Sequence, residues 1–198
     1  MAGQADANGG EVALTVRRRM GGTERLMRFG EQSFGGSFCI AAVLTLCSPT
    51  PLTAAALKAA VHAVADRHDA LRTVIVRKDT FAVAPPSVSP VVDVKTMAVQ
   101  EGGGLTTAAF ADAHAVLAAG TGGGTAPKPS SSADAATPTP VFLPWHAGVY
   151  LPAPGTAHDP ADAAAVAYFL PHYLADGTTA DILAAATIDA LGRPRGRG

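Results

Sequence analysis

The chain has 198 residues, of which 48% are hydrophobic and 16% charged, so it can bury a core and is not disordered throughout. Alanine supplies much of the hydrophobic count, and 21 Gly and 15 Pro dilute it, so we expect a small core for this length. The formal net charge of -1 offers no basic field for a polyanion, which argues against a nucleic-acid partner.

The N-terminal part predicts an arm, a short helix and a strand. Residues 1–22 are expected to form a flexible arm. Thr23 can cap a short helix over 23–27, and Glu24 then lies favourably near its positive end. The apolar run 38–46 is bounded by glycines and a Ser-Pro pair, which is typical of a central strand buried on both faces.

The best helix prediction follows, over 52–71. Its apolar side chains recur at spacings of three and four and define one core-facing side, comprising Leu57, Val61, Val64, His68 and Leu71. The segment TVIV at 73–76 predicts a short strand. Prolines then break the chain, and 91–94 predicts a further β segment.

The second half predicts two helices, two strands and an insertion. In chain order these are an alanine-rich helix over 105–119, a low-complexity insertion over 120–140, antiparallel strands over 141–151 and 163–170, a helix over 178–191 and a tail over 192–198. The last helix is expected to be capped by Asp176 or a threonine. The order of elements predicts an α/β fold, an α+β two-layer sandwich in which a mixed sheet packs with helices.

Cysteine usage and hydropathy bear on the compartment. Cys39 and Cys47 lie in or beside an apolar run and lack C-x-x-C spacing, so we expect buried thiols in a reducing compartment, with neither a disulfide framework nor a zinc site. No charged segment followed by an apolar one opens the chain, and no stretch reaches the roughly 18 to 20 apolar residues that span a bilayer. We therefore expect a cytoplasmic protein without a membrane span.

The segment YFLPHYLADGTT, residues 168–179, carries the strongest chemical signal. It leads His172 out of an apolar strand into an Asp-Gly turn that opens a helix. A histidine there can take a proton from a hydroxyl or an amine, Asp176 can support the loop, and Gly177 permits a positive φ or a close approach of another backbone. A structural histidine beside an apolar strand has the same pattern, so these residues alone leave both interpretations open.

A second segment, RHDALRT at 67–73, ends the long helix with Arg67 and Arg72. A solvated helix end has the same composition. Together, however, the two segments resemble the chloramphenicol-acetyltransferase-like acyltransferase superfamily, which includes nonribosomal peptide condensation domains, alcohol acetyltransferases and plant-type acyl-CoA acyltransferases. The first is similar to its H-x-x-x-D-G active-site motif, and the second to the R-H-x-x-L-R-T segment that closes its first long helix.

The resemblance covers roughly 23–191 and implies an acyltransferase-like N-terminal lobe. It implies that His172 is the catalytic base, that Asp176 and Gly177 are structural at the site, and that Arg72 and Arg67 organise the loop, and it motivates an Arg72–Asp176 ion pair. The implied reaction moves an acyl group from a thioester to an alcohol or amine acceptor. Acyl-CoA or a phosphopantetheine-linked acyl donor is then a substrate, and neither a tightly bound cofactor nor a metal is implied.

Two departures from the family pattern matter. Pro171 stands where many condensation domains carry a first histidine, which is closer to the single-histidine alcohol acetyltransferases. No D-F-G-W-G segment, which marks the second lobe, occurs in the sequence. We therefore expect one lobe of a complete enzyme. The alternative is a non-catalytic half-domain or pseudoenzyme that acts as a protein-interaction module, with a carrier protein or a complementary C-terminal lobe as partner.

Other kinds of site fit less well. The glycine runs at 102–104 and 120–124 lack the Lys and Ser or Thr of a phosphate-binding loop, and the remaining histidines show no metal-binding spacing. We expect Trp145, Phe142 and Tyr150 to serve in packing rather than as a ligand platform.

Overall fold

The computed structural model describes residues 13–33, 39–76, 79–98, 104–119, 141–157 and 159–192. The expected insertion and all of the tail after Gly192 lie outside these residues. The described elements are, in chain order, β1 (Thr15–Arg19), α1 (Gly22–Ser33), β2 (Cys39–Leu46), α2 (Ala54–Arg67), a 3₁₀ turn (Asp69–Arg72), β3 (Thr73–Val76), β4 (Thr80–Val83), β5 (Val91–Met97), α3 (Leu105–Ala118), β6 (His146–Pro152), a second 3₁₀ turn (Pro160–Asp162), β7 (Ala164–Pro171) and α4 (Gly177–Gly192).

A four-stranded sheet in the order β2-β7-β6-β5 forms the centre of the molecule. β5 and β6 run parallel, whereas β7 is antiparallel to both of its neighbours. Every residue of β7 is buried, and its side chains alternate between two core clusters. The mixed sheet with both kinds of pairing is as predicted.

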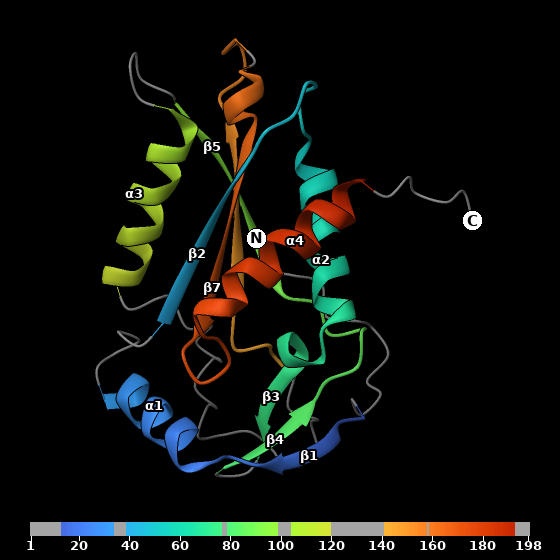
Figure 1. Ribbon diagram of the computed structural model, residues 1–198, viewed down its shortest axis with the longest axis vertical. Coiled ribbons are helices and arrows are strands. Elements are labelled where there is room, and N and C mark those ends of the chain that lie inside the picture. The colour runs from blue at the N-terminus through green and yellow to red at the C-terminus, as the bar shows by residue number, and fades with distance from the viewer. Residues whose placement is uncertain are drawn as a thin grey trace, which may run out of the picture.

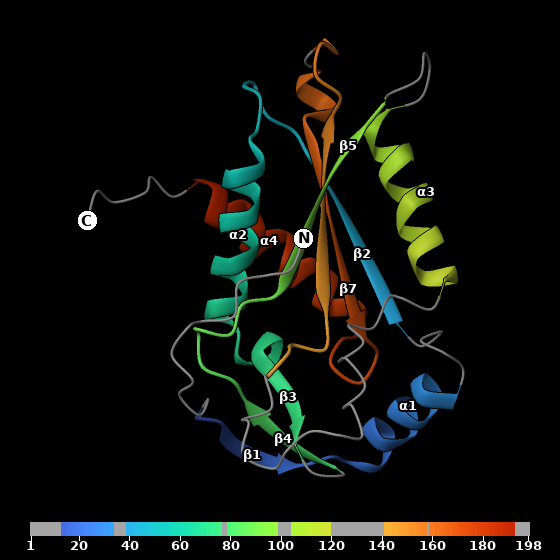
Figure 2. The same ribbon diagram turned by 180° about the vertical axis from the view of Figure 1, so that it is seen from behind.

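Helices cover both faces of this sheet (Figures 1 and 2). α2 packs on one face through Leu57, Val61 and Val64, which are fully buried with Leu183 of α4. α3 packs on the other face through its buried side chains, Leu105, Ala109 and Ala113. The α/β fold is confirmed, and α3 adds a third layer to the expected two-layer sandwich.

A smaller antiparallel sheet, β1-β4-β3, lies beyond one end of the central sheet, next to α1 (Figure 1). β1 falls within 1–22, so at least this part of the expected flexible arm is an ordered edge strand. All five of its residues are exposed, and TVRRR therefore lacks the apolar alternation by which a strand is recognised. β4 was likewise not predicted.

α1 is longer than the helix expected over 23–27, and its cap differs. Thr23 lies inside the helix, whereas the Glu24 carboxylate accepts a hydrogen bond from the Gly21 main-chain N–H at 2.7 Å. α1 buries only Gly30 fully, and Leu26 and Phe29 are each 65% exposed. This helix therefore presents apolar side chains to solvent.

The prediction that 38–46 is a central strand is wrong. β2 is an edge strand of the sheet within the described residues, and most of its side chains are only half-buried. The strand buried on both faces is β7. Both segments are continuous apolar runs, and hydropathy alone does not tell which of them acquires two neighbours.

β6 begins at His146, so residues 141–145 are not part of the expected strand 141–151. Trp145 there is buried and donates its indole N–H to the Leu71 carbonyl at 2.5 Å, which confirms a packing role. Tyr150 is also buried, but Phe142 is 46% exposed and does not pack as expected.

Neither cysteine is fully buried, so the expectation of two buried thiols is wrong. Cys39 is half-buried, and burial first, then the neighbouring Glu31 carboxylate, raises the pKa of its thiol to about 12. Cys47 is exposed, with its thiol 3.3 Å from the Ala161 carbonyl oxygen, and neither cysteine is in a disulfide. Among the described helices, none is long and apolar enough to cross a membrane.

Two side-chain contacts fix α3 to the sheet. Asp162, just before β7, accepts hydrogen bonds from the main-chain N–H of Thr106 at 3.1 and 3.2 Å and from its hydroxyl at 2.6 Å, which caps the start of α3. On the same helix, the Asp112 carboxylate accepts from the Tyr150 hydroxyl at 2.8 Å and from Lys95 of β5 at 2.5 Å. Both contacts join residues far apart in sequence.

Candidate active site

His172 lies in a tight turn directly after the buried strand β7. Leu174 closes the turn by donating its main-chain N–H to the Pro171 carbonyl at 2.9 Å. The His172 side chain is half-buried, and its Nδ1 lies 3.1 Å from the Ala175 carbonyl oxygen. Because a carbonyl only accepts, Nδ1 carries the proton in the neutral ring and Nε2 is the nitrogen left to accept one.

Asp176 holds the far side of this turn by capping α4. Its Oδ1 accepts from the main-chain N–H groups of Thr178 and Thr179, each at 3.1 Å, and from their hydroxyls at 2.7 and 3.0 Å. Hydrogen bonds from the hydroxyls of Thr178 and Thr179, and then from their main-chain N–H groups, hold the pKa of this carboxyl below its ordinary value, against a slight opposing effect of burial. The cap therefore fixes the Ala175–Asp176 peptide, whose carbonyl orients the His172 ring. Asp176 thus acts on His172 indirectly, through the main chain.

Gly177 does not have the special backbone role expected from its position. It is the first residue of α4, it does not adopt a positive φ, and an added Cβ would meet nothing within 4 Å. No geometric requirement for glycine is evident at this position.

A hollow of about 510 Å³ opens beside His172. One of its walls is the β7–α4 turn, from His172 to Thr179, and the other is the first part of α1, with Thr23, Glu24 and Met27. The lining is partly polar and partly apolar, so the hollow can admit a small molecule with an apolar segment next to the imidazole.

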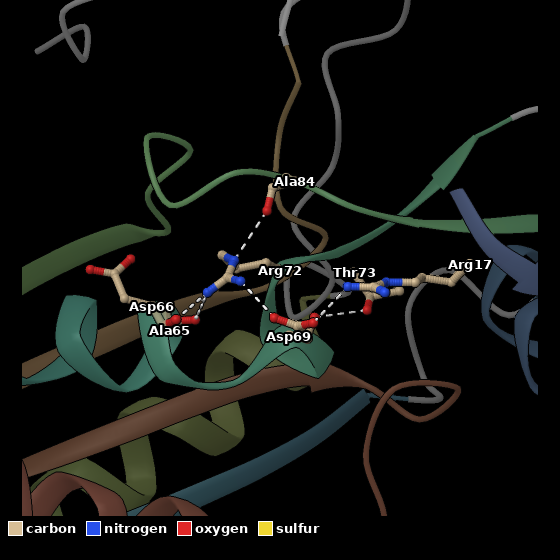
Figure 3. Close-up of polar contacts among 7 residues, drawn as sticks. All are labelled: Arg17, Ala65, Asp66, Asp69, Arg72, Thr73 and Ala84. Atoms are coloured by element: carbon tan, nitrogen blue, oxygen red, sulfur yellow. Dashed lines mark hydrogen bonds and ion pairs between the residues drawn. The ribbon is translucent and has the colours of Figure 1, made fainter. Parts of the chain in front are cut away.

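Arg72 lies elsewhere, at the junction of α2 with the small sheet (Figure 3). Its guanidinium donates to the carbonyls of Ala84 at 3.0 Å, of Ala65 at 3.3 Å and of Asp66, and it pairs with the Asp69 carboxylate at 2.6 Å. Arg72 is 8% exposed, and Asp69 in turn pairs with Arg17 of β1 at 3.0 Å.

The expected Arg72–Asp176 ion pair is therefore wrong. The guanidinium is used up by the last carbonyls of α2 and by Asp69, and the carboxylate of Asp176 is used by α4. Arg67 does not organise the loop either, because it pairs with Asp189 at 2.5 Å and so ties α2 to α4. Of the predicted site residues, the structure brings His172, Asp176 and Gly177 together and leaves both arginines outside the hollow.

Tyr173, which lines the hollow, was not predicted from the sequence, and neither were two residues that lie beyond it, Phe81 and Arg18. Tyr173 stacks with Phe81 of β4, with ring centroids 6.4 Å apart, and the Arg18 guanidinium lies 5.0 Å from the centre of the Phe81 ring. Phe81 comes from the unpredicted strand β4. Arg18 also binds the Glu24 carboxylate, and this six-residue spacing is no recognised contact pattern. Tyr173 alone lay within the motif and could have been examined from sequence.

α4 is held against the sheet behind the site by a buried hydroxyl pair. The Tyr168 hydroxyl lies 2.7 Å from the Thr187 hydroxyl, which itself donates to the Leu183 carbonyl at 2.6 Å. Burial raises the pKa of Tyr168 to about 12, so this hydroxyl stays protonated. The pair fixes α4 on β7, the two elements between which His172 is placed.

Comparison with solved structures places this architecture. The chain superposes on the starter condensation domain of the rhizomide synthetase RzmA with a TM-score of 0.57 at 15% identity, over 88% of this chain and 37% of that chain. The condensation domain of the Monacolin K polyketide synthase MokA gives a TM-score of 0.50 at 14% identity, over 93% and 36%. The X-domain from teicoplanin biosynthesis gives 0.50 at 20% identity, over 91% and 34%.

The chain therefore has the fold of these condensation domains. It spans between 34% and 37% of the length of these solved chains, which fits an N-terminal lobe. No family model matches the sequence, and no curated protein matches it either.

Proposed function

We propose that the polypeptide to which this lobe belongs transfers an acyl group from a thioester to an alcohol or amine, with His172 as the general base. The observation that carries the proposal is the His172 turn. Its Nδ1 is bonded to the Ala175 carbonyl, which leaves Nε2 as the accepting nitrogen, and the residue lines a hollow that can admit a small molecule. The condensation-domain fold supports this assignment at the level of the reaction class.

The chemistry follows from the tautomer of the neutral ring that the Ala175 carbonyl favours. Nε2 of His172 takes the proton of the acceptor hydroxyl or amine as the acceptor oxygen or nitrogen attacks the thioester carbonyl carbon. The carbon–sulfur bond then breaks, and the imidazolium returns the proton to the leaving thiolate, so an ester or amide and a free thiol are formed. Asp176 contributes by holding the turn through the α4 cap rather than by touching substrate.

Acyl-CoA is the donor that we expect first, and an acyl group on the phosphopantetheine arm of a carrier protein is the second possibility. Both present the same thioester to the histidine. A comparison of an acyl-CoA with the same acyl group on a loaded carrier protein would separate them, since only one should support turnover at low micromolar concentration.

The test is turnover of His172→Ala in the longest polypeptide that shows activity with a panel of acyl-CoA donors and alcohol or amine acceptors, followed by mass spectrometry of the acylated product. Loss of the base should reduce kcat by about 10² to 10⁴. Asp181→Asn, on the exposed side of α4 outside the hollow, is the matched control and should retain activity. Unchanged turnover in His172→Ala would refute the role of the base.

A second candidate, a non-catalytic interaction module, is supported by exposed apolar side chains. Leu26 and Phe29 of α1 and Ile182 and Ile188 of α4 are between 51% and 65% exposed. Apolar surface of this kind is often found at protein contacts. Light scattering after gel filtration, with and without a hydrophobic dye, tests this: a monomer that binds no dye would count against the candidate.

A further inference from the structure

The two walls of the hollow come from parts of the chain that are far apart in sequence. α1 contributes one wall and buries only Gly30 fully, whereas the β7–α4 turn contributes the other. A helix so weakly buried depends on polar contacts to keep a fixed distance from His172, and one of these is the Arg25–Asp79 ion pair at 3.4 Å. One side chain that does not line the hollow, Arg18 of β1, makes contacts leading toward both walls.

Arg18 holds the α1 wall through Glu24. Its two terminal nitrogens reach the two carboxylate oxygens of Glu24 at 2.7 and 2.5 Å, in the bidentate geometry that arginine forms best. Glu24 also accepts from the Gly21 main-chain N–H, so the carboxylate fixes the start of α1 to β1. The Arg18 hydrogen bond, more than any other influence, holds the pKa of Glu24 below its ordinary value.

Arg18 also contacts the wall formed by the β7–α4 turn, through two aromatic rings. Its guanidinium lies 5.0 Å from the centre of the Phe81 ring, within the range of a cation–π contact. Phe81 is only 4% exposed and stacks with Tyr173, the residue next to His172, at a centroid distance of 6.4 Å and an interplanar angle of 25°. A change at Arg18 can therefore reach the His172 turn without any contact with substrate.

We propose that Arg18 is a positioning residue that sets the separation of α1 from the His172 turn, and so the width of the hollow, by binding Glu24 and by stacking on Phe81, which in turn stacks on Tyr173. The inference rests on the proposed function only in that it gives the hollow a catalytic use. The coupling of α1 to the His172 turn through Arg18 can be tested without measuring turnover.

The experiment follows each wall with its own reporter in the intact protein. Labelling with 3-fluorotyrosine gives a fluorine signal for Tyr173, assigned with Tyr173→Phe, and ¹³C-methyl methionine gives a signal for Met27, assigned with Met27→Leu. Both are recorded in Arg18→Met, Arg18→Lys and Arg17→Met. Arg17 is the matched control because it is the neighbouring residue on β1, has 53% of its side chain exposed against 57% for Arg18, and also forms one ion pair.

We expect Arg18→Met to shift or broaden both signals and to raise amide hydrogen exchange in α1 and in the His172 turn by roughly threefold to tenfold. Arg17→Met should change neither wall. Arg18→Lys keeps the charge but loses the bidentate fork, so its signals should lie between those of the wild type and Arg18→Met. The fluorine signals of Tyr150 and Tyr168 in the central core should stay unchanged and show that the fold persists.

The proposal is overturned if Arg18→Met perturbs Met27 without Tyr173, or neither, or if Arg17→Met has the same effect. If Arg18→Met unfolds, Arg18→Lys decides, because it keeps the charge and loses the bidentate fork to Glu24. Its Tyr173 and Met27 signals must then both differ from those of the wild type. Failure of the proposed function would look different: His172→Ala would keep its turnover while the coupling between the walls remained.

Discussion

Arg72 offers the most direct test of how this lobe is held together. Replacing it with methionine keeps most of the aliphatic volume but removes the donors to three main-chain carbonyls and the ion pair with Asp69. Its side chain is only 10% exposed. Hydrogen bonds from a charged donor contribute about 1.5 to 3 kcal/mol each.

The carbonyls of Ala65 and Asp66 belong to the last turn of α2, where water can replace part of what is lost. We therefore count about two of the four contacts at full value, which gives a loss of about 3 to 6 kcal/mol in the free energy of unfolding. Domains of this size unfold at about 5 to 15 kcal/mol, so the variant should be severely destabilised.

Urea unfolding monitored by circular dichroism and by the fluorescence of Trp145 measures the loss. Trp145 is the single tryptophan, and its indole is bonded to the Leu71 carbonyl beside Arg72, so it reports on this junction. Arg67→Met is the matched control in the same segment. Its pair with Asp189 is 33% and 47% exposed, and its loss should cost about 0.2 to 1 kcal/mol.

Arg72→Lys should recover part of the loss, since one ammonium cannot reach all four acceptors. This variant also gives a measurable value if Arg72→Met fails to fold. If Arg72→Met and Arg67→Met unfold within about 1 kcal/mol of each other, the reasoning from the buried contacts is refuted.

Three smaller perturbations test other parts of the structure. Asp162→Ala removes the cap of α3 and should cost about 1 kcal/mol, seen as a lower Tm, whereas Asp162→Asn should restore most of it because asparagine caps equally well. Gly148→Ala places a methyl group 2.9 Å from the Tyr150 hydroxyl oxygen, so the ring must move and stability should fall by about 1 to 3 kcal/mol, with a changed near-UV circular dichroism spectrum; an unchanged spectrum and Tm would contradict this. The pKa of Asp176 is lower in the folded state than in the unfolded chain, so its stabilisation is present above about pH 4 and is lost as the pH falls through the folded pKa; the Tm difference between wild type and Asp176→Ala should shrink in acid, and a constant difference would contradict the cap.

The regular elements were largely predictable because their signals are local. The helices over 52–71, 105–119 and 178–191 and the strands over 73–76 and 163–170 were found within a few residues, since periodic apolar residues and cap residues lie within the elements themselves. β1 was missed because TVRRR is an exposed edge strand that carries no alternation. β2 was wrongly predicted as a central strand because the position of a strand in a sheet depends on tertiary contacts, which the local sequence does not encode.

The site was predictable where it is contiguous. His172 and Asp176 lie in one turn, and the cap of α4 by Asp176 was one of two expected alternatives. The partner of Arg72 was predicted wrongly because the family resemblance pointed to Asp176, whereas Asp69, three residues away in the same segment, binds the guanidinium. Arg18 was missed because Phe81 lies in the unpredicted strand β4 and Glu24 lies in α1, so neither contact follows from local spacing along the chain.

The position of β7 in the sheet also governs how the lobe is made. β7 pairs with β2 and β6 and carries the apolar rows of both core clusters, yet it is the last strand to be translated among the described elements. At roughly 5 to 20 residues per second, Leu46 waits on the order of ten seconds for its partner Ala164. Until β7 emerges, α2 and α3 have no completed sheet to cover. The nascent chain therefore exposes apolar surface and should depend on chaperones during synthesis.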